Sequence, residues 1–271
     1  MIGQDSLSTK TLDNRALSFL AGGGELGAMI RAHDWSATPL GPPEHWPQSL
    51  KTTVGIMLTS RQPIWVGWGP ELTYLYNDPY KSIIGGKHPW ALGRPTREVW
   101  SEIWPDIGPM LETAMGGREG TFVEEQLLIM ERNGYPEETY YTFSYSPVRG
   151  DDGLPGGIIC ANSDDTQRVI GERQLALLRD LAAETATAKD WREACDQAAK
   201  ALARNRHDVT FALLYVVEPG AEQAELAAAT GVSPGDPVAP ATLALGDAAI
   251  WPIGQALAGG AAVTVDLAAL A

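Results

Sequence analysis

The sequence predicts an α+β fold: a five-stranded antiparallel sheet with short helices, then a linker helix, then an incomplete second α+β domain. From Pro63 apolar residues alternate with period two in two runs, which is the spacing of strands, and three further strand-like runs follow from residue 121. Helical segments broken by Gly and Pro stand between the second and third runs, and no parallel crossover pattern appears. From residue 165 the apolar spacing becomes helical, and 271 residues are enough for two domains.

Residues 1–60 are expected to form an N-terminal extension with amphipathic helices. The segment 26–32 predicts a short helix, and a Pro-rich connector that carries tryptophan follows it. In 48–60 four apolar residues recur near helical spacing, which predicts a helix that packs on another part of the protein. These residues are Leu50, Val54, Met57 and Leu58.

Residues 61–164 are expected to hold the sheet. A turn at 69–71 separates the first two runs, which predicts a hairpin. The second strand should end at 77–79, because Asn77 or Asp78 accepts the free N–H groups of a first helical turn and Pro79 needs no donor there. The remaining strands are predicted at 121–131, 137–148 and 154–163, with a hairpin turn at Asn133-Gly134.

Residues 165–190 predict the linker helix, and 191–271 the incomplete second domain. The linker carries apolar residues at 3-4-3 spacing, a seam that can pair with the same helix of a second copy. The alternative is one helix that packs on its own domain. The seam consists of Leu175, Leu178, Ala182 and Thr185. Asp190 is a candidate N-cap for the next helix, and a hairpin follows it.

The composition excludes some partners. A formal net charge of −14 disfavours nucleic acid and anionic membrane surfaces, because both attract Lys and Arg. No apolar run approaches the roughly 20 residues of a membrane span, and the N-terminus has no secretory signal, so we expect a cytoplasmic protein. Cys160 and Cys195 can in principle pair, but in the cytosol we expect reduced, buried thiols.

The sequence contains no convincing motif for catalysis or for cofactor binding. Gly22, Gly24 and Gly27 match a dinucleotide-binding spacing without the strand and crossover that it requires. The four histidines lack metal-ligand spacing, and His88 is expected to be hydrogen-bonded rather than a haem ligand. Five carboxylates are expected to be solvated, so we expect no enzyme in this chain. They are Glu102, Asp106, Glu112, Glu124 and Glu125.

Aromatic residues are dense between residues 65 and 145. Strand alternation directs one subset inward, beneath the short helices, where a modest pocket for an apolar or aromatic small ligand can form. The alternative is a fully packed core. The pocket candidates are Trp65, Tyr74, Trp100, Trp104, Phe143 and Tyr145.

The order of strands and helices resembles a PAS domain, a sensory module of bacterial signalling proteins. The segments ATPLGPPEHWPQSL, WGPELTYLYNDPY, GKHPWALGRP and EVWSEIWPDIGP are similar to those at the N-terminus of bacterial sensor histidine kinases. Asp164-Asp165-Thr166 is similar to the Asp-x-Thr ending of PAS domains, which implies that Asp164 and Thr166 tie the sheet to the outgoing helix. The middle residue, usually apolar, is Asp here.

The second domain resembles the opening of a GAF domain, by its order of elements rather than by a motif. The chain lacks the phosphoacceptor and ATP-binding motifs of a kinase core. The segment 83–95 also lacks the cysteine with which light-sensing relatives trap flavin, so no flavin–cysteine adduct is expected and any cofactor is unknown.

The leading hypothesis is therefore the sensory input region of a PAS–GAF sensor histidine kinase in a two-component system. A ligand or partner would act on the sheet, and the linker helix of a homodimer would carry the response. The alternatives are a ligand-free dimerisation module and, more weakly, an enzyme that uses acidic residues above the sheet.

Overall fold

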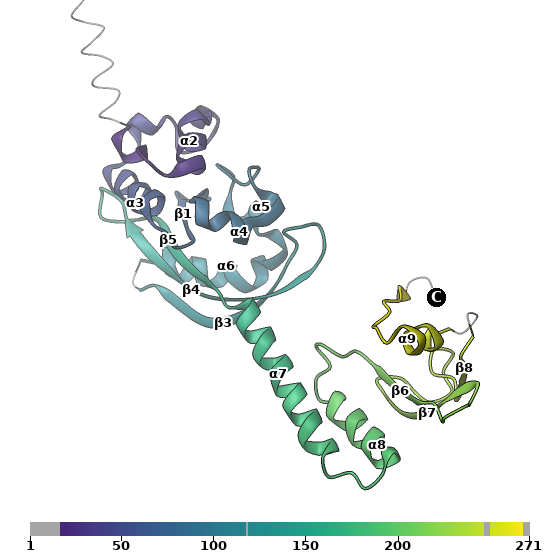
Figure 1. The fold of residues 1–271 in the computed structure, drawn as a ribbon. Helices are drawn as coiled ribbons and strands as arrows, with labels where there is room; N and C mark the ends of the chain where they lie inside the picture. The colour runs from purple at the N-terminus through teal and green to yellow at the C-terminus, as the bar shows by residue number, and fades with distance from the viewer. Residues whose placement is uncertain (1–16, 118, 247–249, 268–271) are drawn as a thin grey trace, which may run out of the picture. The chain divides into compact units, whose positions relative to one another are not determined.

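The structure is a computed structural model, and it describes residues 17–117, 119–246 and 250–267. It divides into two compact units, residues 1–169 and 170–271, which are described separately (Figure 1). The first unit contains five strands. They are β1 (Ile64–Trp68), β2 (Thr73–Tyr76), β3 (Thr121–Met130), β4 (Glu137–Arg149) and β5 (Pro155–Asp164).

The helices of the first unit are short. The α-helices are α2 (Gly24–Ala32), α3 (Gln48–Thr59), α4 (Lys81–Ile84), α5 (Thr96–Val99) and α6 (Trp104–Met115). The 3-10 helices are η1 (Ser18–Leu20), η2 (Trp35–Ala37), η3 (Pro43–His45), η4 (Asp78–Tyr80), η5 (Gly85–Lys87) and η6 (Ser101–Ile103). Helix α7 (Thr166–Thr185) begins two residues after β5 and continues into the second unit.

The five strands form one antiparallel sheet in the order β2-β1-β5-β4-β3. The last strand therefore lies in the middle, where Trp65 pairs with Cys160 and Tyr145 pairs with Cys160 from the other side. The predicted antiparallel five-stranded sheet is confirmed. A bulge in β3 places Glu124 and Glu125 opposite one residue of β4, and it bends the edge strand.

Both faces of the β1–β2 end are buried. Helices α4, α5 and α6 lie over the face that carries Trp65 (Figure 1). Val66 and Leu75 are paired on the opposite face, and both are fully buried because α3 packs there. The predicted helix at 48–60 is confirmed, and its four apolar residues are buried.

The N-terminal segment 17–60 shares the core of the sheet. Leu20, Ile30 and Trp35 belong to the same buried cluster as the strand residues. Two aspartates of the PAS-like region cap its helices. Asp78 accepts hydrogen bonds from the first amides of α2, and Asp151 from the first amides of α3.

Asn77 ends β2 as predicted. Its side chain accepts a hydrogen bond from the backbone N–H of Tyr80, and Pro79 lies in the first turn of η4. The same side-chain oxygen also accepts the N–H of Ile64, and the amide donates to the carbonyls of Met57 and Gln62. Asn77 thus joins β1, the end of α3 and η4.

The second unit is built on a smaller sheet. It contains most of α7, then α8 (Trp191–Leu202), β6 (Ala212–Val216), β7 (Gln223–Thr230), β8 (Thr242–Ala244) and α9 (Ile253–Gly259). The sheet is antiparallel in the order β6-β7-β8. Asp190 caps α8 as predicted, accepting the N–H of Glu193 at 2.9 Å. The similarity of this unit to a GAF domain stays a prediction.

No helix among the described residues is both long and apolar enough to cross a bilayer.

Candidate functional site

The inward face of the sheet carries a cluster of aromatic side chains. The rings of Trp65 and Tyr74 stack with their centroids 4.9 Å apart, and the Trp65 and Tyr145 rings meet edge to face at 5.8 Å. Phe143 lies 4.9 Å from Tyr145, and Trp100 donates its indole N–H to the Tyr74 hydroxyl at 3.0 Å. Five of the six pocket candidates are therefore buried together.

These rings leave little space between them. The cavity beneath the helices has a volume of about 20 Å³, close to that of one water site. Trp65, Trp100, Phe143 and Tyr145 line this cavity, whereas Tyr74 and Trp104 do not. In this conformation the core is filled, as the alternative to a ligand pocket requires. Burial also raises the pKa values of the Tyr74 and Tyr145 hydroxyls well above the usual range, so both stay neutral.

The junction, residues 164–166, joins β5 to α7 through β4. One carboxylate oxygen of Asp164 accepts the N–H of Thr166 at 3.0 Å. The Thr166 hydroxyl accepts the N–H of Tyr140 at 3.0 Å, and the Tyr140 carbonyl accepts the N–H of Asp165 at 2.9 Å. Thr166 is 8% exposed, so these bonds are largely shielded from water. The predicted coupling residues thus contact β4 and the first turn of α7.

Arg132 extends this network to the helices above the sheet. Its guanidinium donates to the carbonyls of Ser82 and Ile83 in α4 and to the hydroxyl of Tyr141 at 2.9 Å. The Tyr141 hydroxyl in turn donates to Asp164 at 3.4 Å. A chain of hydrogen bonds therefore runs from α4 to the junction.

Sequence reasoning missed Arg132, because a lone arginine beside a hairpin turn is usually solvated. The available signal was its place in the Glu-Arg-Asn-Gly turn, one residue before the hairpin pair Asn133-Gly134. Its side chain is only 14% exposed and pairs with Glu137 at 3.2 Å. This burial is what no sequence pattern indicated.

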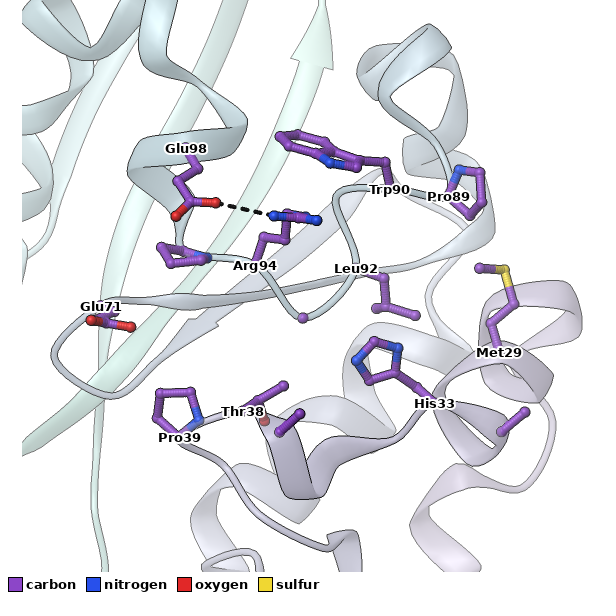
Figure 2. Close-up of a pocket in the computed structure, with 14 residues that line it drawn as sticks. Met29, His33, Thr38, Pro39, Glu71, Pro89, Trp90, Leu92, Arg94 and Glu98 are labelled. Carbon is purple, nitrogen blue, oxygen red and sulfur yellow. Dashed lines mark hydrogen bonds and ion pairs between the residues drawn. The ribbon is translucent and has the colours of Figure 1, made fainter.

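A much larger cleft lies at the surface of the first unit (Figure 2). Its volume is about 750 Å³, within the range of small-molecule sites. One wall is the end of α2 and the segment after η2, with Met29, His33 and Pro39. The other wall is the loop 88–95, with Trp90 and Arg94, together with Glu98 of α5 and Glu71 of the β1–β2 turn.

Hydrogen bonds hold the loop wall of the cleft to the sheet. The N–H of Gly93 donates to the carbonyl of Tyr74 at 2.9 Å, and the Tyr74 N–H donates to the carbonyl of Arg94 at 2.8 Å. Gly93 has a φ of +79°, and a Cβ there would lie 2.7 Å from Nε2 of His33. Only glycine therefore lets the two walls approach this closely.

A second set of contacts holds the α2 wall. Glu25 at the start of α2 forms an ion pair with Lys81 at 2.6 Å and a contact with His88 Nε2 at 3.2 Å. The other ring nitrogen of His88 lies 2.8 Å from the hydroxyl of buried Tyr76. The prediction of a hydrogen-bonded His88 is confirmed by these contacts. Because both walls are fixed, the cleft is preformed.

The described carboxylates do not gather as an acid–base pair. Glu102 forms a largely buried ion pair with Lys87 at 2.5 Å, and Glu125 pairs with Arg168 at 2.7 Å. Within residues 17–117, 119–246 and 250–267, no group of three metal-binding side chains occurs. Cys160 and Cys195 are free thiols, and burial raises the pKa of Cys160, which keeps it protonated.

The seam of α7 faces solvent within the second unit. Leu175 is 68% exposed and Leu178 is 60% exposed, and Ala182 is exposed beside them. Thr185 is half-buried, and its hydroxyl donates back to the carbonyl of Leu181 at 2.8 Å. The two leucines form an apolar patch that no described residue covers.

Comparisons with known proteins address the first unit. A family model described as the PAS fold matches residues 58–170. The comparison with curated proteins gave no match.

Three solved structures illustrate the structural similarity. An RNA-binding Light-Oxygen-Voltage receptor is 22% identical with a TM-score of 0.35; the alignment covers 48% of this chain but only 36% of that one. The PAS domain of a Colwellia psychrerythraea protein is 15% identical over 44% of this chain and 98% of its own, with a TM-score of 0.35. A sensory box sensor histidine kinase from Vibrio cholerae is 14% identical over 38% of this chain and 77% of its own, with a TM-score of 0.29.

The matched family model, the antiparallel strand order with the last strand in the middle, and the junction between β5 and α7 agree with one another. Residues 58–170 of this chain therefore have a PAS fold.

Proposed function

We propose that this chain is a sensory input region, in which a change at the PAS sheet alters α7. The observation that carries the proposal is the junction: the Thr166 hydroxyl and the Asp164 carboxylate bind both β4 and the first turn of α7. A signal that shifts β4 relative to β5 therefore changes the hydrogen bonds that start the helix. Two arrangements of the junction, with different stabilities in the two signalling states, would be enough to transmit it.

Thr166→Val is expected to uncouple α7 from the sheet without unfolding the sheet. The valine keeps the shape of threonine but leaves the partly buried N–H of Tyr140 without its acceptor, a loss of about 1–3 kcal/mol. Hydrogen–deuterium exchange should therefore speed up at Tyr140 and in the first turn of α7, while β1 amides stay protected.

Thr166→Ser is the matched control, because it keeps the hydroxyl and should exchange like the unmodified protein. Equal exchange in the valine and serine variants, or equal signalling by the two variants in the full-length protein, would contradict the proposal.

A second role, dimerisation through α7, is favoured by the exposed leucines of the seam. Two copies of this patch would bury Leu175 and Leu178 against each other, with Ala182 allowing close approach of the helices. In such a dimer, a change at the junction would shift α7 relative to the α7 of the second copy. This role does not require a ligand.

Leu175→Glu together with Leu178→Glu is expected to shift a dimer to the monomer, because carboxylates would face each other across an apolar contact. Multi-angle light scattering measures the change in mass directly. Ala183→Glu, a charge change at an exposed position of the same helix about 120° away from the centre of the seam, should leave the mass unchanged. A monomeric unmodified chain would rule out the seam as a homodimer interface.

The wider context is part of this proposal. A sensor histidine kinase of a two-component system would place a kinase core in a longer protein, with a GAF-like second unit between it and the PAS fold. A cytoplasmic location fits the acidic composition and the free thiols. The full-length gene product, assayed for autophosphorylation, tests this context.

A further inference from the structure

Because the core is filled, a small molecule that this protein senses has no internal binding site. A cavity of about 20 Å³ cannot hold a metabolite, whereas the surface cleft has a volume of about 750 Å³. The cleft is also connected to the sheet, because its loop wall is hydrogen-bonded to Tyr74 of β2. We propose that this cleft, between α2 and the loop 88–95, binds a zwitterionic α-amino acid with an apolar side chain.

The charges of the lining carry the choice of ligand. Arg94 is the cationic side chain of the lining, and Glu71 and Glu98 are its carboxylates (Figure 2). Burial lowers the pKa of His33, against the smaller opposing effect of Asp34, so that the imidazole stays neutral near pH 7. A simple anion would meet two carboxylates, and a simple cation would meet the guanidinium. A ligand with both charges satisfies both kinds of group.

The ion pair already present in the cleft shows how the two charges fit. Arg94 and Glu98 lie 3.4 Å apart and are about half exposed, so the pair is long and adds little stability. A carboxylate and an ammonium on one α-carbon can replace it with two shorter contacts, carboxylate to Arg94 and ammonium to Glu98. The exchange leaves neither charge of the ligand unpaired.

The remaining lining suits an apolar side chain. The Arg94 guanidinium carbon lies 4.7 Å from the centroid of the Trp90 ring, a cation–π contact that restrains the cation beside an apolar surface. Met29, Leu92 and Pro39 provide apolar surface beside it. Polar anchors beside an apolar surface are what discriminate an aliphatic or aromatic amino acid from a polar one.

Isothermal titration calorimetry on residues 1–271 tests the inference. L-leucine, L-methionine and L-phenylalanine are titrated, and N-acetyl-L-leucine and L-leucinamide each remove one of the two charges. At least one amino acid should bind with a Kd below about 1 mM, and both derivatives should bind at least about tenfold more weakly. No heat from any of the three amino acids at 10 mM (on the order of ten times that Kd), or equal binding of the derivatives, would overturn it.

Variants connect the binding to the cleft. Arg94→Gln and Glu98→Gln should each weaken binding at least about tenfold. Arg97→Gln is the matched control: Arg97 lies over Trp104, outside the lining, and its substitution should leave the Kd unchanged within about twofold. Circular dichroism checks that each variant is folded. Equal binding by Arg94→Gln and Arg97→Gln would contradict the assignment.

The inference that the cleft is the input of a sensor rests on the function proposed above. The inference that the cleft binds an amino acid does not. Hydrogen–deuterium exchange of α7 with and without the bound amino acid separates the two. Binding with altered exchange in the first turn of α7 supports both. Binding with unchanged exchange upholds the cleft and contradicts signalling from it to α7.

Discussion

Asn77→Ala is expected to lower the free energy of unfolding of the PAS fold by about 3–5 kcal/mol. Asn77 is 1% exposed, and its side chain binds the N–H groups of Ile64 and Tyr80 and the carbonyls of Met57 and Gln62. Alanine leaves the buried N–H of Ile64 without its acceptor and removes the side-chain bonds to the other three groups. Urea unfolding, followed by tryptophan fluorescence, measures the loss.

Asn133→Ala provides the control for this prediction. Asn133 is exposed and makes its contacts at the surface, so its loss should cost less than about 1 kcal/mol. If Asn77→Ala unfolds at the same urea concentration as Asn133→Ala, then Asn77 does not connect β1, α3 and η4 as described.

Trp65→Ala is expected to destabilise the PAS fold by about 3–5 kcal/mol, because it removes the ring at the centre of the aromatic cluster. Trp65 is 2% exposed and contacts both Tyr74 and Tyr145. In a core with a cavity of only about 20 Å³, the space left by the ring is new. Urea or thermal unfolding measures the change.

Trp90→Ala is the matched control, since Trp90 is 46% exposed on the loop of the cleft. Its loss is expected to change the unfolding free energy by less than about 1 kcal/mol. A Trp65→Ala variant that is as stable as Trp90→Ala would mean that the aromatic cluster is loosely packed, and the pocket hypothesis for the core would regain its support.

Much of the PAS fold was predictable because its signals are local. Strand-like runs and turn signals located all five strands of the first unit to within two residues, and the Asn77 cap set the end of β2. The inward positions of Phe143 and Tyr145 on β4 were also predicted, and both residues are buried. These features depend on neighbours in sequence, and alternation along a strand reports them directly.

The cleft and the Arg132 network were not predictable, because they depend on residues far apart in the chain. His33 and Gly93 are in contact although they are 60 residues apart in the sequence. Arg132 contacts residues of α4 that precede it by 49 and 50 positions. Trp104 was expected beside the core cavity, yet it is partly exposed on α6, since helical spacing alone does not fix which face turns inward. The short strand β8 lies in a Pro-rich segment whose pattern predicts a loop.

The central claim is that α4, Arg132, Tyr141 and the junction act as one connected unit on α7. A double-mutant cycle between Arg132→Gln and Thr166→Val tests it most directly. The readout is the opening free energy of the Val169 amide, measured by hydrogen–deuterium exchange. This amide donates to the carbonyl of Asp165 in the first turn of α7. The two side chains share no direct contact, so a coupling energy above about 0.5 kcal/mol is predicted only if the network transmits. Additive effects, within about 0.3 kcal/mol, would contradict the account.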